Sequence, residues 1–200
     1  MIATKFDRLL DFIENRKTDL YTESDDMRGF IESGIDSIKS KITPGCKVLD
    51  IGCGQGYALE LFTRHGAEPI GITLNEEEKG IVDAKGHDVR IMDMSSLDFE
   101  KNHFDILWSR HSLEHSVFPF FTLAEWYRVL KPGGLLYLEV PAPDTKNNHE
   151  FNQNHYSVFG IRMWQSLLMR SGFKVLGVFN IDLQSENGNK DLYFRIWAEK

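Results

Sequence analysis

The 200-residue sequence is poor in cysteine and has no long apolar run. Cys46 and Cys53 are its only cysteines, and they form no CxxC pair. Such a pattern does not supply a disulfide framework, so a reducing compartment is expected. No stretch approaches the ~20 apolar residues of a membrane span, and the charged opening segment MIATKFDRLLDFIENRK is unlike a secretory signal. We therefore predict a cytoplasmic protein that does not enter the membrane.

The sequence also lacks a block of basic residues, an internal repeat and a low-complexity segment. Its net charge is −7, with acidic and basic residues interspersed. Binding to a phosphate backbone usually leaves a basic footprint, so a nucleic-acid partner is not expected. The apolar fraction of 42% and the charged fraction of 26% are ordinary for a globular protein. The chain length suits one α/β domain.

Apolar residues near the start of the chain follow helical spacing. One stripe runs from Phe6 to Ile13 and a second from Met27 to Ile38. Pro44-Gly45 then breaks the pattern. We interpret residues 1–44 as an N-terminal helical cap and residues 45–200 as the core domain. The cap is expected either to cover an exposed part of the sheet or to help shape a substrate pocket.

After this break, short apolar strands alternate with amphipathic helices. Strands are predicted at Lys47–Ile51, Pro69–Thr73, His87–Met92, Phe104–Ser109 and Leu135–Val140. Alternation of this kind predicts a parallel sheet with helices on both faces. The predicted strands Phe173–Phe179 and Leu192–Glu199 are separated only by a loop around Ser185–Asn189. That loop is too short for a crossover helix, so these two strands should pair antiparallel.

The strongest candidate for a ligand site is the turn after the first strand, Gly52-Cys53-Gly54-Gln55-Gly56, which opens a helix. Glycines at such a position let the main chain approach a ligand closely. The pattern is GxGxG rather than the GxGxxG of dinucleotide sites, and Asp50 precedes the first glycine. A carboxylate at this point suits a cationic ligand better than a pyrophosphate. This argues against an NAD-dependent dehydrogenase.

Four segments, in the expected order and spacing, resemble class I S-adenosylmethionine (SAM)-dependent methyltransferases of the methyltransferase-11-like branch. They are VLDIGCGQG, FDILWSRHSLEH, WYRVLKPGGLLYLEVP and HYSVFGIRMWQSLLMRSGF. The resemblance covers about residues 45–200. It implies a Rossmann-like α/β fold, in which a seven-stranded, mostly parallel sheet has its last strand inserted antiparallel. It also implies SAM as the cofactor, with methyl transfer to an oxygen or nitrogen of a small molecule.

The resemblance assigns cofactor-binding roles along the strand ends. Gly52, Gly54 and Gly56 would pass the methionine half of SAM, and Asp50 would help to position it. Thr73 occupies the place of the usual ribose-binding acid. This is a departure, since a hydroxyl binds a ribose less strongly than a carboxylate does. Two further residues complete the set, Asp93 as acceptor from the adenine amino group and Met94 as its packing surface. Asp50 and Asp93 could instead be simple turn residues.

Methyl transfer from a cationic sulfur needs alignment and exclusion of water more than a fixed catalytic group. A general base is required only for a nucleophile such as a hydroxyl. His111 and His115, which follow the fourth strand, are the candidates, although either could be purely structural. His149 and His155 lie in the polar stretch after the fifth strand, where His149 could simply be solvated.

The segment His111-x-x-Glu114-His115 is also similar to the ExxEH metal site of ubiquinone-biosynthesis O-methyltransferases and of small-RNA ribose methyltransferases, with His155 as a later ligand. The histidine in first place disfavours magnesium and favours a transition metal. We assign no metal from the sequence. Metal-assisted O-methylation, with an RNA ribose as one candidate acceptor, stays an alternative. Two others are cyclopropane-fatty-acid-synthase-like chemistry and a catalytically silent SAM-binding module. The sequence specifies neither the acceptor nor the oligomeric state.

Overall fold

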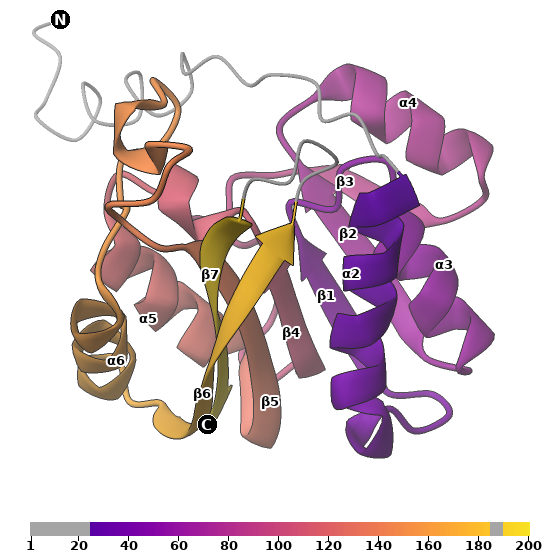
Figure 1. Cartoon of the computed structure of the whole chain (residues 1–200). Helices are drawn as coiled ribbons and strands as arrows, with labels where there is room; N and C mark the ends of the chain where they lie inside the picture. The colour runs from indigo at the N-terminus through magenta and orange to yellow at the C-terminus, as the bar shows by residue number, and fades with distance from the viewer. Residues whose placement is uncertain (1–24, 185–189) are drawn as a thin grey trace, which may run out of the picture.

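The computed structural model describes residues 25–184 and 190–200 (Figure 1). The predicted helix at residues 6–13 and the predicted turn at residues 185–189 lie outside these ranges. The strands are β1 (Lys47–Ile51), β2 (Glu68–Thr73), β3 (Asp88–Ile91), β4 (Phe104–Arg110), β5 (Leu130–Pro141), β6 (Lys174–Gln184) and β7 (Lys190–Glu199). The α-helices are α2 (Asp25–Ser37), α3 (Tyr57–Arg64), α4 (Glu76–Ala84), α5 (Pro119–Val129) and α6 (Ile161–Arg170). Short 3₁₀ helices follow three of the elements, η1 (Lys39–Lys41), η2 (Leu113–His115) and η3 (His149–Phe151).

The strands form one seven-stranded sheet in the order β3-β2-β1-β4-β5-β7-β6. β1 to β5 pair in parallel, and β7 lies antiparallel between β5 and β6. This confirms the predicted mixed sheet and the predicted antiparallel pairing of the last two strands. The strand order reverses at β1 and β4, and in open α/β sheets ligands bind beyond the strand ends at such a point.

Helices cover both faces of the sheet, with α2, α3 and α4 on one side and α5 and α6 on the other (Figure 1). Successive residues of a strand point to opposite faces. Val48 of β1 therefore packs with Phe62 of α3, whereas the adjacent Leu49 packs with Trp126 of α5 and Trp164 of α6. Continuous apolar runs in the central strands fill both cores, as expected for parallel strands buried on two sides.

The strand predicted at Leu135–Val140 begins earlier in the structure, where Lys131–Gly134 is also part of β5. Leu130 pairs with Phe104 of β4, and the register shifts before Leu135 pairs with Ile106. Gly133, with φ of +76°, absorbs the irregularity. The strand begins early because Leu130 pairs with Phe104, and Gly133 N donates to the Lys200 carbonyl at 2.9 Å. Both partners are distant in sequence, so the local pattern does not indicate them.

α2 packs on the sheet through Ile31 and Ile35, and Ile38, the residue directly after the helix, joins them; the three are 7%, 1% and 2% exposed. The described part of the predicted N-terminal cap thus contributes to the core. Among residues 25–184 and 190–200, none of the helices combines the length and the apolar character that crossing a bilayer requires.

Candidate active site

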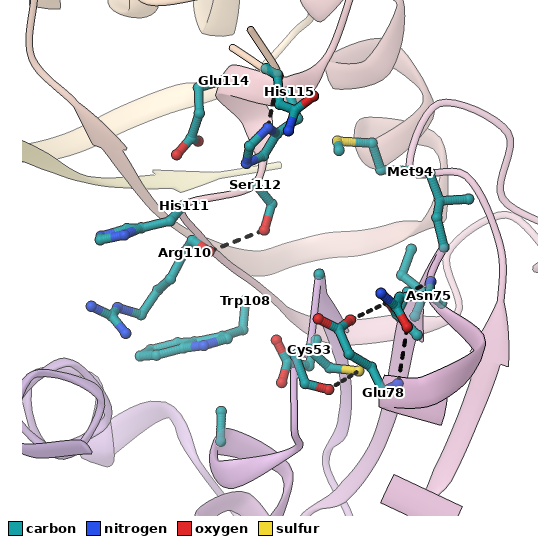
Figure 2. Close-up of a pocket in the computed structure, with 18 of the residues that line it drawn as sticks. Cys53, Asn75, Glu78, Met94, Trp108, Arg110, His111, Ser112, Glu114 and His115 are labelled. Carbon is teal, nitrogen blue, oxygen red and sulfur yellow. Dashed lines mark hydrogen bonds between the residues drawn. The ribbon is translucent and has the colours of Figure 1, made fainter. Parts of the chain in front are cut away.

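A cavity of about 460 Å³ opens at the carboxyl ends of β1, β2 and β4. Its size is within the range of small-molecule sites. One half is lined by the turn after β1 and the residues that follow β2 and β3. The other half is lined by η2, by the loop that contains η3, and by Tyr193 of β7. We call these the cofactor half and the acceptor half. Figure 2 shows Cys53 and Glu78 on the first side and His111, Glu114 and His115 on the second.

The turn after β1 is held too tightly to accept a side chain at Gly52. Gly52 N and Cys53 N both donate to the Ile72 carbonyl, at 3.0 and 3.1 Å. The Ser112 hydroxyl donates to the Ile51 carbonyl at 2.8 Å and so closes the turn from the other side. A Cβ at Gly52 would collide with that hydroxyl, and the φ of +75° also favours glycine. The main chain itself therefore forms this wall of the cavity.

Asp50 and Gly54 also line the cavity, whereas Gly56 does not. Asp50 is at the end of β1 and is only 3% exposed. Gly56, with φ of +88°, precedes the first residue of α3, and a Cβ there would meet the Val82 side chain of α4 at 3.0 Å. The structure therefore gives Gly56 a packing position behind the turn, and it brings Asp50, Gly52 and Gly54 together at the cavity.

Thr73 lines the cavity, but its hydroxyl is already engaged. It donates to Glu78 Oε2 at 2.5 Å and accepts from Asn75 N at 3.1 Å. Asn75 caps α4 through its side chain, which places Glu78 in the first turn of the helix. Glu78 is 5% exposed and lines the cavity. Glu78 was not predicted from the sequence, because the favourable interaction with the helix dipole alone explains three consecutive glutamates at a helix start.

Met94 lines the cavity and Asp93 does not. Asp93 Oδ1 accepts from Ser95 N at 2.7 Å, which is the turn role weighed for it from the sequence. The Trp126 indole N–H donates to the Met94 carbonyl at 3.0 Å and fixes this loop against α5. Met92 and Leu74 add further apolar surface beside Met94.

In the acceptor half, His111 is half-buried and lines the cavity, but its Nε2 is inaccessible to solvent. Its ring stacks on Tyr193 with centroids 4.4 Å apart and an angle of 5° between planes. Its Nε2 is buried and has no hydrogen-bond partner among the described residues. Burial, together with a smaller contribution from the neighbouring Arg110, lowers the pKa of His111 to about 3. His111 is therefore neutral at physiological pH and is a weak base.

Below His111, a buried ionic row crosses three adjacent strands. Glu139 of β5 accepts from the guanidinium groups of Arg110 on β4 and of Arg195 on β7, the latter at 2.8 Å. The Tyr137 hydroxyl donates to the same carboxylate at 2.5 Å. Burial opposes the charged form of Glu139, but Arg110 holds its pKa below the usual value. Three charges on neighbouring strands thus support the floor of the acceptor half.

Glu114, His115 and His155 form a cluster in which one ligand atom from each lies within 4.8 Å of the others. Burial raises the pKa of Glu114 to about 8, and burial lowers that of His155 to about 4. His149 lies beside them but is bound elsewhere, with its Nε2 at 2.6 Å from Asp191 Oδ2. The structure therefore brings both predicted catalytic histidines to the cavity, but only His115 belongs to this cluster.

A family model described as a methyltransferase domain matches residues 49–138. The chain is 27% identical over 157 residues to 2-methyl-6-phytyl-1,4-hydroquinone methyltransferase of Synechocystis sp., covering 72% of this chain and 46% of that protein. It is 31% identical over 133 residues to ubiquinone biosynthesis O-methyltransferase of Aromatoleum aromaticum, covering 63% and 54%. The chain spans about half the length of these curated relatives.

Solved structures with the same fold include a SAM-dependent methyltransferase from Methanosarcina mazei, with a TM-score of 0.72, 22% identity, and coverage of 82% of this chain and 96% of that one. They also include the [4+2]-cyclase SpnF, with a TM-score of 0.75, 18% identity, and coverage of 92% and 84%. At these identities the likeness establishes the fold alone.

Proposed function

We propose that this chain is a class I SAM-dependent methyltransferase that transfers a methyl group from SAM to an oxygen or nitrogen atom of a small molecule, because a methyltransferase-domain model matches residues 49–138 and the curated relatives are methyltransferases. The observation behind this proposal is that one cavity joins the glycine turn and Asp50 to a polar, histidine-rich half. When bound, SAM supplies a methyl carbon on a cationic sulfur, which leaves readily. The chain then has to hold both reactants in line and keep water out.

The residues of the cofactor half fit SAM. The buried Asp50 carboxylate beside a glycine wall suits the cationic amino-acid end. Met94, with Leu74 and Met92, offers an apolar surface for the adenine ring. Gly54 would pass the methionine half with Gly52, while Gly56 would act through the packing of α3. Asp93 would contact the adenine amino group only from the rim of the cavity.

We assign the ribose contact to Glu78, with Thr73 as its support. The Thr73 hydroxyl has a single proton, which it donates in the hydrogen bond to Glu78. The Glu78 carboxylate lies at the cavity wall, where it can accept from a ribose hydroxyl. The acid that the strand end lacks would thus come from the first turn of the next helix.

In the acceptor half, His115 is a better candidate for a general base than His111. His115 Nδ1 lies 2.8 Å from the Asn154 carbonyl and must donate to it, so Nε2 carries the lone pair. The buried His111 would instead orient the acceptor site through Tyr193. α2 also contributes, since Met27 and Ile31 line the cavity. A cytoplasmic location and a small-molecule acceptor stay predictions.

The test is isothermal titration of the purified protein with SAM, S-adenosylhomocysteine and NAD, using Asp50→Asn and the matched control Asp88→Asn at the exposed start of β3. We expect SAM and its product to bind, NAD not to bind, and Asp50→Asn to weaken binding about tenfold or more, since a charge-assisted contact contributes over 1 kcal/mol. Asp88→Asn should bind as the wild type does.

A second arm measures transfer directly, because the solved structures that share the fold include a protein named as a cyclase. Methyl-labelled SAM is incubated with hydroxyl- and amine-bearing acceptors, and labelled product and S-adenosylhomocysteine are measured. Tight SAM binding with no transfer to any acceptor would favour a silent SAM-binding module over an enzyme. Failure of SAM and its product to bind would contradict the proposal.

A further inference from the structure

Glu114 and His115 in η2, together with His155 after η3, present one carboxylate and two imidazoles to the same side of the cavity. Figure 2 shows Glu114 and His115 on the segment that follows β4, beside Ser112. Their ligand atoms lie within 4.8 Å of one another. A tetrahedral ion about 2.1 Å from each donor would bring them to about 3.4 Å apart. Small side-chain rotations are enough to close that difference.

Both histidines are already oriented as metal ligands usually are. His115 Nδ1 lies 2.8 Å from the Asn154 carbonyl, and His155 Nδ1 lies 3.0 Å from the His149 carbonyl. A carbonyl oxygen only accepts, so each Nδ1 carries the proton and each Nε2 has the lone pair. Hydrogen bonds of this kind fix the tautomer and the ring plane of metal-binding histidines.

The two loops that supply the ligands are joined through Glu114. Its carbonyl accepts from Tyr156 N and Ser157 N, at 2.8 and 2.9 Å, which holds the His155 loop against η2. The Glu114 side chain is buried, and its Oε2 has no hydrogen-bond partner among the residues the structure describes. A buried, unpaired carboxylate oxygen is costly, and a cation would satisfy it.

Two neighbouring histidines are excluded as ligands by their own contacts. His111 stacks on Tyr193 and is not among the residues whose ligand atoms converge. His149 directs its Nε2 to Asp191, at 2.6 Å. The ligand set is therefore not the contiguous His-x-x-Glu-His segment. It is the last two residues of that segment, joined by a histidine 40 positions further along the chain.

We propose that Glu114, His115 and His155 bind a divalent first-row transition metal ion at the acceptor end of the cavity. Two imidazoles and one carboxylate suit an ion such as Zn²⁺ or Mn²⁺ better than Mg²⁺, which prefers oxygen ligands. Three protein ligands leave a coordination position for water or an acceptor oxygen, as in catalytic rather than structural sites. The binding site itself does not depend on the proposed function. Its use in activating an acceptor hydroxyl does, and His115 would then serve as a ligand instead of a base.

The experiment uses the untagged 200-residue chain, stripped with a chelator and titrated calorimetrically with Zn²⁺, Mn²⁺ and Mg²⁺. The ligand variants are Glu114→Gln and His155→Ala, and the matched control is His87→Ala, in the turn between α4 and β3. We expect one Zn²⁺ or Mn²⁺ per chain, with binding at least about tenfold weaker in both ligand variants. His87→Ala should bind Zn²⁺ and Mn²⁺ as the wild type does. Mg²⁺ should not bind to the wild type with comparable affinity. Co²⁺ absorption supplies an independent signature of nitrogen and oxygen ligation.

Folding of each variant is checked by circular dichroism. If Glu114→Gln does not fold, His155→Ala alone tests the proposal, because His155 is half-buried in a loop. Wild-type affinity in His155→Ala, or no Zn²⁺ or Mn²⁺ binding by the wild type, would overturn the proposal. S-adenosylhomocysteine is titrated in parallel. Metal binding without cofactor binding would count against the proposed function only, and the reverse against the metal site only.

Discussion

The cofactor half and the acceptor half of the cavity are built in different ways. In the cofactor half, the wall is main chain, shaped by a short turn in which Gly52 has a φ of +75° and the N–H groups of Gly52 and Cys53 donate to the Ile72 carbonyl of the adjacent strand. In the acceptor half, the wall is side chains from segments far apart. The ring of His111 stacks on Tyr193, and the imidazole of His115 is held by the Asn154 carbonyl at 2.8 Å.

This difference explains which mutations each half should tolerate. A wall of main chain depends on φ values and close approach, so it fails when any side chain is added. A wall of side chains depends on buried polar contacts, so it fails when a partner is removed. Glu139→Gln should perturb the acceptor half and Gly52→Ala the cofactor half, whereas Glu78→Gln changes a single side chain within the cofactor half.

The largest effect is expected from Glu139→Gln, which removes the charge between Arg110 and Arg195. Their side chains are 7% and 12% exposed, so two guanidinium groups would be left buried without their carboxylate. Breaking a buried ion pair in this way costs about 3–5 kcal/mol in the free energy of unfolding. Urea denaturation measures it.

The matched control is Asp105→Asn, which removes an ion pair with Lys131 whose side chains are 36% and 37% exposed. Because solvent screens such a pair, its loss should cost less than about 1 kcal/mol. Equal losses of stability in the two variants would show that the buried row of charges does not support the acceptor half. Affinity for S-adenosylhomocysteine, measured where Glu139→Gln is folded, should change much less than stability.

The next effect is expected from Gly52→Ala, which breaks the cofactor half. A methyl group there would collide with the Ser112 hydroxyl that holds the end of β1. The turn must open, and we expect affinity for S-adenosylhomocysteine to fall about hundredfold, equivalent to about 2.7 kcal/mol. Calorimetric titration measures the loss.

Gly80→Ala is the control, since a Cβ at this exposed helical position meets nothing within 4 Å. It should bind S-adenosylhomocysteine normally and gain about 0.5–1 kcal/mol in stability. Wild-type affinity in Gly52→Ala would mean that the main chain of this turn does not form the cofactor wall.

The same contrast explains how much could be predicted from the sequence. The order of the strands, the glycine turn and the terminal hairpin follow from local patterns, namely the alternation of periods and the spacing of glycines. These patterns give five parallel strands and a terminal antiparallel pair, whereas a single seven-stranded sheet with its last strand inserted antiparallel was implied by the family resemblance. β5 begins earlier than predicted, because Leu130 pairs with Phe104 and Gly133 donates to the Lys200 carbonyl, and neither partner is a neighbour in sequence.

The acceptor half could not be predicted to the same extent. His111 and His115 were recognised as candidates because they directly follow a strand, whereas Glu114 and His155 were considered together only through the resemblance to the ExxEH metal site. Nothing local to His111 indicates that Tyr193 will cover its ring, and nothing local to His155 indicates that it will meet Glu114. Such contacts join residues about 40 or more positions apart, and no hydrophobic period or turn signal records them.

The smallest effect is expected at Glu78, a side chain of the cofactor half that was not predicted from the sequence. Asn75 and Glu78 have the spacing of a capping box, in which the glutamate normally reaches back to the N–H of the capping residue. Here Glu78 accepts from the Thr73 hydroxyl instead, and it lies at the cavity wall. Glu78→Gln keeps the size of this side chain and removes its charge. If the carboxylate accepts from a ribose hydroxyl, affinity for S-adenosylhomocysteine should fall about fivefold to tenfold, or about 1–1.4 kcal/mol.

The control for Glu78→Gln is a second ligand rather than a second protein variant. The 2′,3′-dideoxyribose analogue of S-adenosylhomocysteine lacks the hydroxyls that Glu78 would bind, so its affinity should be nearly the same for wild type and variant. The two proteins and two ligands form a cycle that isolates the contact from any general loosening of α4. Equal losses for both ligands would mean that Glu78 only supports Thr73 and the helix start. A loss confined to the ribose-bearing ligand would assign to α4 a contact that the end of β2 does not supply, and the main-chain wall would then be completed by one charged side chain.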